Sequence, residues 1–215
     1  GVNGIHFGPD GYLYATSVIG SDISVVNTAA KEIVRRYGAA DGVFGPDDVA
    51  FNKNGDFYWT SILTGEVAGF SHDGIRVVAA NLGPGVNPIT FSDDGRLFVA
   101  QCFFGDGLYE VDPLGEKEPR SIRDDLGPGC GLNGMDWGPD NRLYGPRWFD
   151  NEVISVDVDT GESRSNTETA TCSNISISCS SSWTRASTGA TEREPEPGPS
   201  SVTRCGLTCR QAFPF

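Results

Sequence analysis

Short runs of alternating apolar and polar residues follow one another along most of the chain, separated by small polar turns. The first apolar segment, residues 5–7, is followed by Pro9-Asp10-Gly11 and then by an aromatic and β-branched run over residues 12–18. An Asp-Gly pair favours a tight hairpin turn because glycine adopts positive φ at little cost. Two more strands are predicted over residues 23–26 and 32–37, each after a further polar turn.

The same pattern of inner strand, turn and aromatic strand is repeated four times, over residues 3–14, 47–58, 87–98 and 133–144. Measured at the turn residue, Gly11 to Gly55 is 44 positions, Gly55 to Gly95 is 40 and Gly95 to Asn141 is 46. Units of about 40–50 residues with four strands are typical of β-propeller blades. No sustained 3.6-residue spacing supports a helical alternative. The predicted fold class is therefore all-β, a β-propeller of four-stranded blades.

The predicted organisation is four blades, residues 1–40, 41–82, 83–126 and 127–164, followed by a tail over residues 165–215. Residues 163–171 show no apolar alternation, so the fourth blade is expected to lack its outer strand. The tail is rich in Ser, Thr, Pro and Cys and has no periodic apolar positions. Such a composition predicts an irregular, disordered segment, or one read from a shifted coding frame.

Composition narrows the class of partner. The 215-residue chain has a formal net charge of −13, which argues against nucleic acid because phosphate binding needs a basic face. No apolar run approaches the ~18 residues of a membrane span, so no membrane association is expected. The chain opens at Gly1 without a charged-then-apolar leader. We expect a soluble protein, processed or a fragment, with the compartment open between cytoplasmic and secreted.

Residues 133–137, Asn-Gly-Met-Asp-Trp, are followed by the Asp140-Asn141 turn and an aromatic strand. This motif resembles the inner-strand motif of the senescence marker protein / gluconolactonase family of six-bladed propellers, to which calcium-dependent phosphotriesterases and paraoxonase-like lactonases are similar. The resemblance covers residues 1–164, and it implies an incomplete six-bladed propeller. In that family one divalent ion, usually calcium, lies on the central axis and is held by acid and amide side chains at the starts of the innermost strands.

The matching column in this sequence is Asn3, Asp47, Asn87 and Asn133. Carboxylate and amide oxygens suit a hard cation such as calcium. The family order is Glu, Asn, Asn, Asp, whereas the order here is Asn, Asp, Asn, Asn, so a single carboxylate predicts a weak half-site. Asp48 would replace Asp47 if the strand register were shifted by one residue, because successive side chains point to opposite faces.

The resemblance assigns Asp47 as the candidate for activating water and the three asparagines as residues that position ion or substrate. The alternative for each is structural, since Asn and Asp at strand starts commonly form turns and caps. Aromatic residues near second-strand ends are candidates for a substrate mouth: Trp59, Phe103 and Trp148, with Phe104 and Phe149 nearby. Their alternative is packing between blades.

The remaining reactive side chains add little. We expect His6 to be buried between blades rather than to shuttle protons, and His72 to be solvated in a polar turn. Asp136 could support a metal ligand, although an ordinary hydrogen-bonded strand Asp is favoured. No Gly-x-Ser-x-Gly elbow is present, so serine nucleophile chemistry is unsupported. Cys102 and Cys130 are candidates for buried free thiols, and the tail cysteines match no zinc framework.

The leading hypothesis is a divalent-metal-dependent hydrolase of lactones or related small-molecule esters, with calcium as the expected cofactor. The alternative is a non-catalytic propeller that binds a protein or a small ligand. A third hypothesis, lyase chemistry on a cyclic ester, needs a base that these residues hardly supply. The sequence leaves the substrate, the oligomeric state and the choice between calcium, magnesium and zinc open.

Overall fold

The computed structural model describes residues 1–127 and 130–165. The chain separates into two compact units, Gly1–Thr171 and Cys172–Phe215. The second unit lies outside the described residues, and so do the predictions made for residues 166–215. The first unit is described below.

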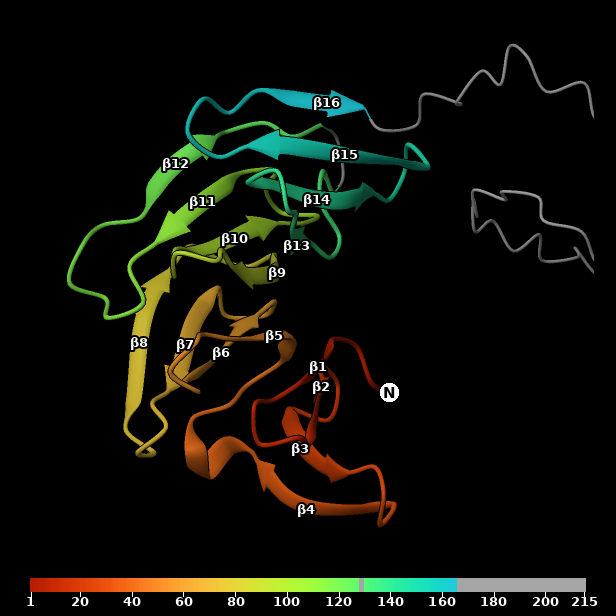
Figure 1. Ribbon diagram of the computed structural model, residues 1–215, viewed down its shortest axis with the longest axis vertical. Coiled ribbons are helices and arrows are strands. Elements are labelled where there is room, and N and C mark those ends of the chain that lie inside the picture. Colours follow the sequence, from red (N-terminus) through yellow and green to blue (C-terminus); the bar gives the residue numbers. More distant parts are fainter. Residues whose placement is uncertain (128–129, 166–215) are drawn as a thin grey trace, which may run out of the picture. The chain divides into compact units, whose positions relative to one another are not determined.

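Four antiparallel sheets of four strands each make up this unit (Figure 1). The first sheet contains β1 (Ile5–Phe7), β2 (Leu13–Ser17), β3 (Asp22–Asn27) and β4 (Glu32–Tyr37). The second contains β5 (Pro46–Phe51), β6 (Phe57–Ser61), β7 (Glu66–Phe70) and β8 (Arg76–Asn81). The third contains β9 (Val86–Phe91), β10 (Leu97–Gln101), β11 (Leu108–Val111) and β12 (Arg120–Arg123). The fourth contains β13 (Asp136–Trp137), β14 (Arg142–Arg147), β15 (Glu152–Asp157) and β16 (Ser163–Ser165), and a 3-10 turn, Ala39–Asp41, joins the first two sheets.

Each sheet keeps its strands in chain order, and tight turns set the register. The turn between the first two strands has a residue with positive φ in every sheet: Gly11 at 80°, Gly55 at 87°, Gly95 at 90° and Asn141 at 60°. Asparagine tolerates this conformation better than most residues, which explains how it replaces glycine in the fourth turn. The predicted all-β fold with four-stranded units is confirmed.

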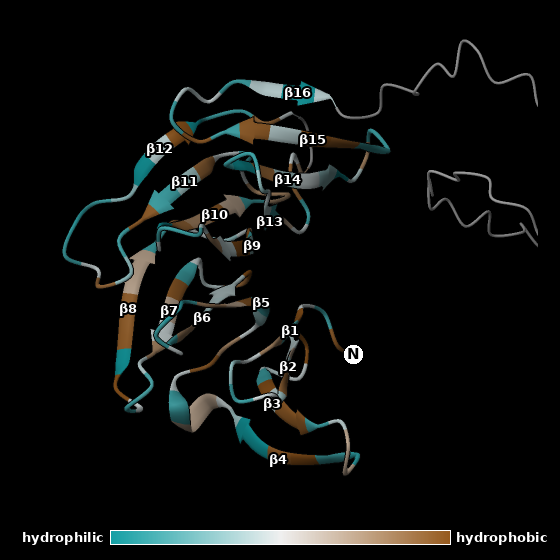
Figure 2. Ribbon diagram, in the orientation of Figure 1, coloured by the Kyte–Doolittle hydropathy of each residue, from teal (hydrophilic) through white to brown (hydrophobic). Residues whose placement is uncertain are grey.

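Adjacent sheets pack face to face through three apolar clusters. Tyr14 and Ile23 of the first sheet pack against Trp59 of the second, and Val67 of the second packs in a cluster with Leu97 of the third. The third cluster joins the last two sheets. Figure 2 shows hydrophobic segments within the strands, whereas the loop between β11 and β12 is mostly hydrophilic. Each inner sheet therefore has two buried faces, which requires apolar residues at both sets of alternating positions.

The fourth sheet differs from the sequence prediction, because its outer strand is present. β16 pairs with β15 through Ile154 opposite Ser165 and Val156 opposite Ser163. All three residues of β16 are exposed. An edge strand is held by backbone hydrogen bonds and needs no apolar face, so the absence of alternation did not exclude it.

Helical structure in the described residues is confined to the 3-10 turn. No helix there is long and apolar enough to cross a membrane.

The burial of Trp59 leads to a prediction about the stability of the fold. It is fully buried between the first two sheets, and its ring centroid lies 5.5 Å from that of Phe70. Trp59→Ala should lower the free energy of unfolding by about 3–5 kcal/mol, because it removes a large side chain and leaves a cavity. Trp148, which is 55% exposed, is the matched control, and Trp148→Ala should cost about 0.5 kcal/mol or less. Urea unfolding of both variants measures the difference, and equal losses would contradict the packing described here.

Candidate functional site

The starts of the inner strands carry the residues of the predicted metal column. In β5, Pro46 lies opposite Ser61 and Val49 opposite Trp59, so one extra residue is inserted around Asp47 and Asp48. In β9, Val86 lies opposite Gln101 and Ile89 opposite Val99, and the same insertion falls around Asn87. A β-bulge re-aims the side chains of the bulged strand. The repeat thus places a distortion of the backbone at the column position in both central sheets.

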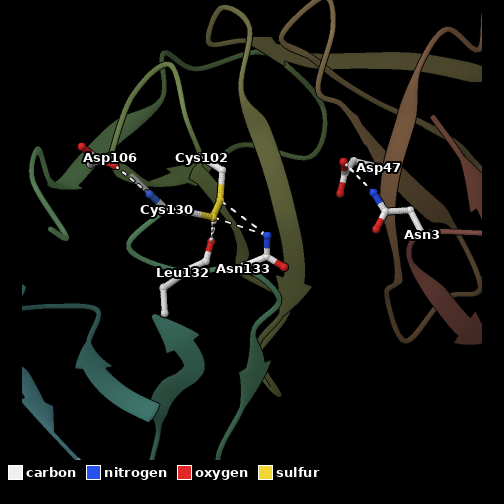
Figure 3. Close-up of a disulfide and its surroundings, with 7 residues drawn as sticks. All are labelled: Asn3, Asp47, Cys102, Asp106, Cys130, Leu132 and Asn133. Atoms are coloured by element: carbon white, nitrogen blue, oxygen red, sulfur yellow. Dashed lines mark hydrogen bonds between the residues drawn. A yellow bond between two sulfur atoms is a disulfide. The ribbon is translucent and has the colours of Figure 1, made fainter. Parts of the chain in front are cut away.

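Two members of the column contact each other across the first two sheets. The Asn3 amide nitrogen donates a hydrogen bond to Oδ2 of Asp47 at 2.9 Å (Figure 3). Asp47 is only 3% exposed, whereas Asn3 is exposed. Asn87 is also buried, at 6% exposure. The structure therefore brings Asn3 and Asp47 together, although they lie 44 residues apart in the chain.

Backbone contacts fix the column in place. The Thr16 hydroxyl donates to the carbonyl oxygen of Asp47, and the Thr60 hydroxyl donates to that of Asn87 at 2.5 Å. Each threonine therefore ties the second strand of one sheet to the inner strand of the next. The Gly4 backbone nitrogen donates to the Asp47 carbonyl at 2.8 Å, and a Cβ on Gly4 would lie only 2.7 Å from that oxygen. A side chain at position 4 would push the two strands apart.

Backbone groups of two sheets hold the Asp48 carboxylate. Its Oδ1 accepts a hydrogen bond from the Val49 nitrogen at 2.9 Å, and its Oδ2 accepts one from the Ile89 nitrogen of the third sheet at 3.1 Å. Both oxygens are occupied by backbone donors. On Asp47, by contrast, the hydrogen bond from Asn3 falls on Oδ2.

The junction between the third and fourth sheets is built differently. Ala100 stands at the position equivalent to Thr16 and Thr60, so no hydroxyl is available there. Instead Cys102, just after β10, forms a disulfide with Cys130, before β13. The prediction of free thiols was wrong. Repeat packing brings together two cysteines separated by 28 residues, and their being the only two in the repeat region was the signal available in the sequence.

The disulfide also orients Asn133. Its amide nitrogen donates to Sγ of Cys130 at 3.4 Å and is 3.9 Å from Sγ of Cys102. Figure 3 shows this nitrogen pointing toward the two sulfur atoms. Because the nitrogen is directed at sulfur, the amide oxygen of Asn133 is the atom that remains for a ligand.

Burial perturbs both carboxyl groups. Desolvation, with a smaller effect from the neighbouring charge of Asp48, raises the pKa of Asp47 from 3.8 to about 7. Desolvation also raises the pKa of Asp48 to about 6, while hydrogen bonds from Ile89 and Val49 oppose the rise. A carboxylate with a pKa near neutrality can exchange a proton at physiological pH.

The side chains of the column offer one carboxylate and several amide oxygens, and such oxygen ligands suit a hard cation. Within residues 1–127 and 130–165, no group of three or more His, Cys, Asp or Glu side chains is arranged to hold a metal ion. Any cation bound at this column would therefore depend largely on amide oxygens of Asn3, Asn87 and Asn133, with Asp47 supplying the charge.

The aromatic candidates fall into two groups. Trp59 is fully buried in the cluster between the first two sheets, which contradicts its predicted place at a substrate mouth. It lies within β6, opposite Val49 and Ala68, so its ring packs inside rather than at the strand end. Phe103 and Trp148 follow β10 and β14 and are 48% and 55% exposed.

Phe103 and Trp148 lie at the same end of their sheets as the column. Gln101, two residues before Phe103, pairs with Val86, which directly precedes Asn87. The backbone nitrogen of Asn133 donates to the carbonyl oxygen of Pro146, two residues before Trp148, at 3.0 Å. The Phe103 and Trp148 ring centroids are 5.6 Å apart in an edge-to-face contact, and Phe149 stacks on Trp148 at 5.6 Å. We call these three residues the aromatic cluster. It is available for contact with a ligand or partner.

Three other candidates have exposed side chains. His6 was expected to be buried between blades, but it is exposed, because β1 is uncovered along all three of its residues. Its ring lies 5.6 Å from that of Phe51. Asp136 is exposed and accepts a hydrogen bond from the Trp137 nitrogen at 2.8 Å. His72 pairs with Asp56 at 2.9 Å in an exposed turn, as the polar turn predicted.

Comparison with solved structures decides the architecture. Virginiamycin B lyase from Staphylococcus aureus matches with a TM-score of 0.62 at 18% identity, over 76% of this chain and 54% of that one. A protein proposed to be a gluconolactonase matches with a TM-score of 0.60 at 18% identity, over 76% of this chain and 62% of that one. The fold is that of a β-propeller.

This propeller chain spans only part of the length of both proteins. A chain from a nidogen/laminin complex also matches, with a TM-score of 0.54 at 16% identity, over 75% of this chain and 78% of that one. No family model matches the sequence. No curated protein matches it either. At these identities the likeness establishes the fold, and the chemistry must be argued from the residues.

The raised pKa values of the two carboxyls predict a pH dependence of the metal-free protein. Their stabilising effect is fully present below the unfolded pKa of 3.8 and is lost as the pH rises through about 6 and 7. Between pH 5 and pH 8, the free energy of unfolding should fall by about 4 kcal/mol, the larger part of it from Asp47. Urea unfolding in the presence of a chelator measures this slope. Asp47→Asn should reduce the fall to the smaller part that Asp48 contributes, and a variant with the parent's slope would contradict the assignment.

The disulfide gives a second prediction. The Cys102→Ala/Cys130→Ala double variant should lose about 3 kcal/mol of unfolding free energy, because the cross-link closes a loop of 28 residues. It should also disturb ligand binding at Asn133, whose amide nitrogen loses both sulfur partners. Peptide mapping of the parent under non-reducing conditions provides the direct check. Recovery of both cysteines as free thiols would contradict the linkage.

Proposed function

We propose that this chain forms part of a divalent-metal-dependent hydrolase that opens lactones or related esters, with calcium as the expected ion. The observation that carries the proposal is the Asp47 carboxylate, which is buried at the start of an inner strand and hydrogen-bonded to Asn3 of the neighbouring sheet. A buried carboxylate with a raised pKa and an amide partner is costly for stability alone, and such groups cluster at functional sites.

Each residue of the column has its own role in the proposed reaction. Asp47, the one carboxylate of the column, takes a proton from the attacking water. Asn3 holds one Asp47 oxygen in place through its 2.9 Å hydrogen bond. Asn87 and Asn133 offer amide oxygens that position the ion or the substrate. A bound divalent cation would polarise the ester carbonyl and make water more acidic.

The aromatic cluster supplies a surface for the apolar part of the substrate. Phe103 and Trp148 lie at the column end of the third and fourth sheets and expose about half of their side-chain surface. Contact with an exposed ring removes apolar area from water and orients a flat lactone ring. Substrates with a larger apolar substituent should therefore be favoured over small, fully hydroxylated lactones.

The test is hydrolysis of a panel of γ- and δ-lactones by the full chain, with and without added calcium, measured as the release of acid. A calorimetric titration with calcium measures binding of the ion. Asp47→Asn should lower kcat/KM by about 100-fold or more, because it removes the general base. Its calcium affinity should fall at least about tenfold, since the single carboxylate of the donor set is lost.

Asp93→Asn is the matched control. Asp93 is an exposed carboxylate in the turn between β9 and β10, at the opposite end of the sheet from the column. This variant should keep the parent rate and calcium affinity. If the parent shows no calcium-dependent turnover on the panel, or if Asp47→Asn retains the parent rate, the hydrolase proposal fails.

A second candidate function is a non-catalytic binding module. The exposed aromatic cluster favours it, because large exposed rings in contact commonly mark interaction surfaces. The nidogen/laminin complex illustrates that this architecture occurs in a protein assembly. Calorimetry that detects no ion, combined with the absence of turnover, would support this reading. Mass spectrometry separates the lyase alternative, because hydrolysis adds one water to the product and elimination adds none.

A further inference from the structure

A recess of about 320 Å³ lies between the first two sheets, at the end opposite the metal column. It is bordered by the hairpin turns at Asp10 and Gly55, which follow the inner strands β1 and β5, whereas the column lies where the inner strands begin. This recess is therefore separate from the candidate hydrolase site, and it needs an explanation of its own.

Five aromatic rings from two sheets line the recess: Tyr14 and Tyr37 from the first, and Phe51, Phe57 and Phe70 from the second. The Tyr14 ring lies 4.8 Å from Phe51, and the Tyr37 ring lies 5.1 Å from Phe57 and 5.3 Å from Phe70. The rings hold one another in edge-to-face and tilted contacts. Such a lining is suited to a flat aromatic group that can add to the same packing.

Arg35 supplies a positive charge at the recess. It projects from β4 opposite Val25, a residue of the cluster between the first two sheets, and its guanidinium carbon lies 4.0 Å from the centre of the Tyr37 ring. Among the residues that the structure describes, Arg35 has no salt bridge. Its neighbour Arg36 instead pairs with Asp22 at 2.6 Å. A stacked, unpaired guanidinium is prepared to bind a carboxylate through two parallel hydrogen bonds.

The other charged groups at the recess already have partners. Asp10 accepts hydrogen bonds from the Tyr14 hydroxyl and the Tyr12 nitrogen, both at 3.0 Å. The His72 ring pairs with Asp56 at 2.9 Å and with Asp73 at 3.4 Å. Asp10 is hydrogen-bonded at both carboxylate oxygens, so Arg35 is the cation of the lining that is left to pair with a ligand.

We propose that the recess is a binding site for a small aromatic carboxylate, whose ring packs against the half-buried Phe51 and Phe70 of the lining and whose carboxylate pairs with Arg35. The volume of about 320 Å³ matches a molecule with one aromatic ring and a short acidic side chain. The site lies outside the hydrolase proposal and does not depend on it.

The experiment is calorimetric titration of the full chain with 3-phenylpropanoate, with the fluorescence of the protein as a second signal. Trp59 lies 6.0 Å from Phe57, a ring of the recess lining, and should report on binding. Arg35→Gln should weaken binding at least about tenfold, because the ion pair is lost. Arg36→Gln is the matched control and should bind as the parent does, and Asp47→Asn should also leave affinity unchanged.

Two further probes separate charge from shape. The uncharged 3-phenylpropanamide should bind at least about tenfold more weakly than the acid, and added salt should weaken binding of the acid. Tighter binding of 2-phenylethylamine would mean that Asp10 rather than Arg35 selects the ligand and would overturn the proposal. So would an Arg35→Gln variant with the parent affinity, or the absence of saturable binding of the acid up to about 10 mM.

Discussion

Face-to-face packing of each sheet on the next is the constraint on which the other features depend. A single four-stranded sheet with apolar side chains on both faces is not stable in water, and here each inner sheet is covered by the two that flank it in the chain. Trp59 and Leu97 occupy matching faces of successive sheets and are fully buried. The packing brings the inner strands into contact, and through them it assembles residues from distant parts of the sequence.

Assembly at the inner strands depends on specific bonds as well as on burial. Thr16 and Thr60 hold the carbonyl oxygens of Asp47 and Asn87, so the two column residues are fixed through their backbones while their side chains remain available for a ligand. At the third junction a disulfide replaces the hydroxyl and holds Asn133 through its amide nitrogen. The threonine hydrogen bonds and the disulfide each restrain a column residue and thereby position its side-chain oxygen.

The two ends of the sheets have different chemical characters. The end where the inner strands begin offers amide and carboxylate oxygens, together with the exposed rings of Phe103 and Trp148. The hairpin end between the first two sheets offers buried rings and the guanidinium of Arg35. Because opposite ends of antiparallel strands are formed by different turns, a repeat protein can carry separate sites on them without altering the core.

The sequence by itself determined the strands, their four-fold repetition and the turns, because alternation and Asp-Gly or Asp-Asn pairs are local signals. It also placed Asp47 at an inner-strand start. Only tertiary structure decided that Trp59 is buried while Trp148 is exposed, that Cys102 meets Cys130, and that β16 completes the fourth sheet. Those outcomes depend on which face a neighbouring sheet covers and on contacts between residues far apart in the chain, and a single sequence read locally carries neither.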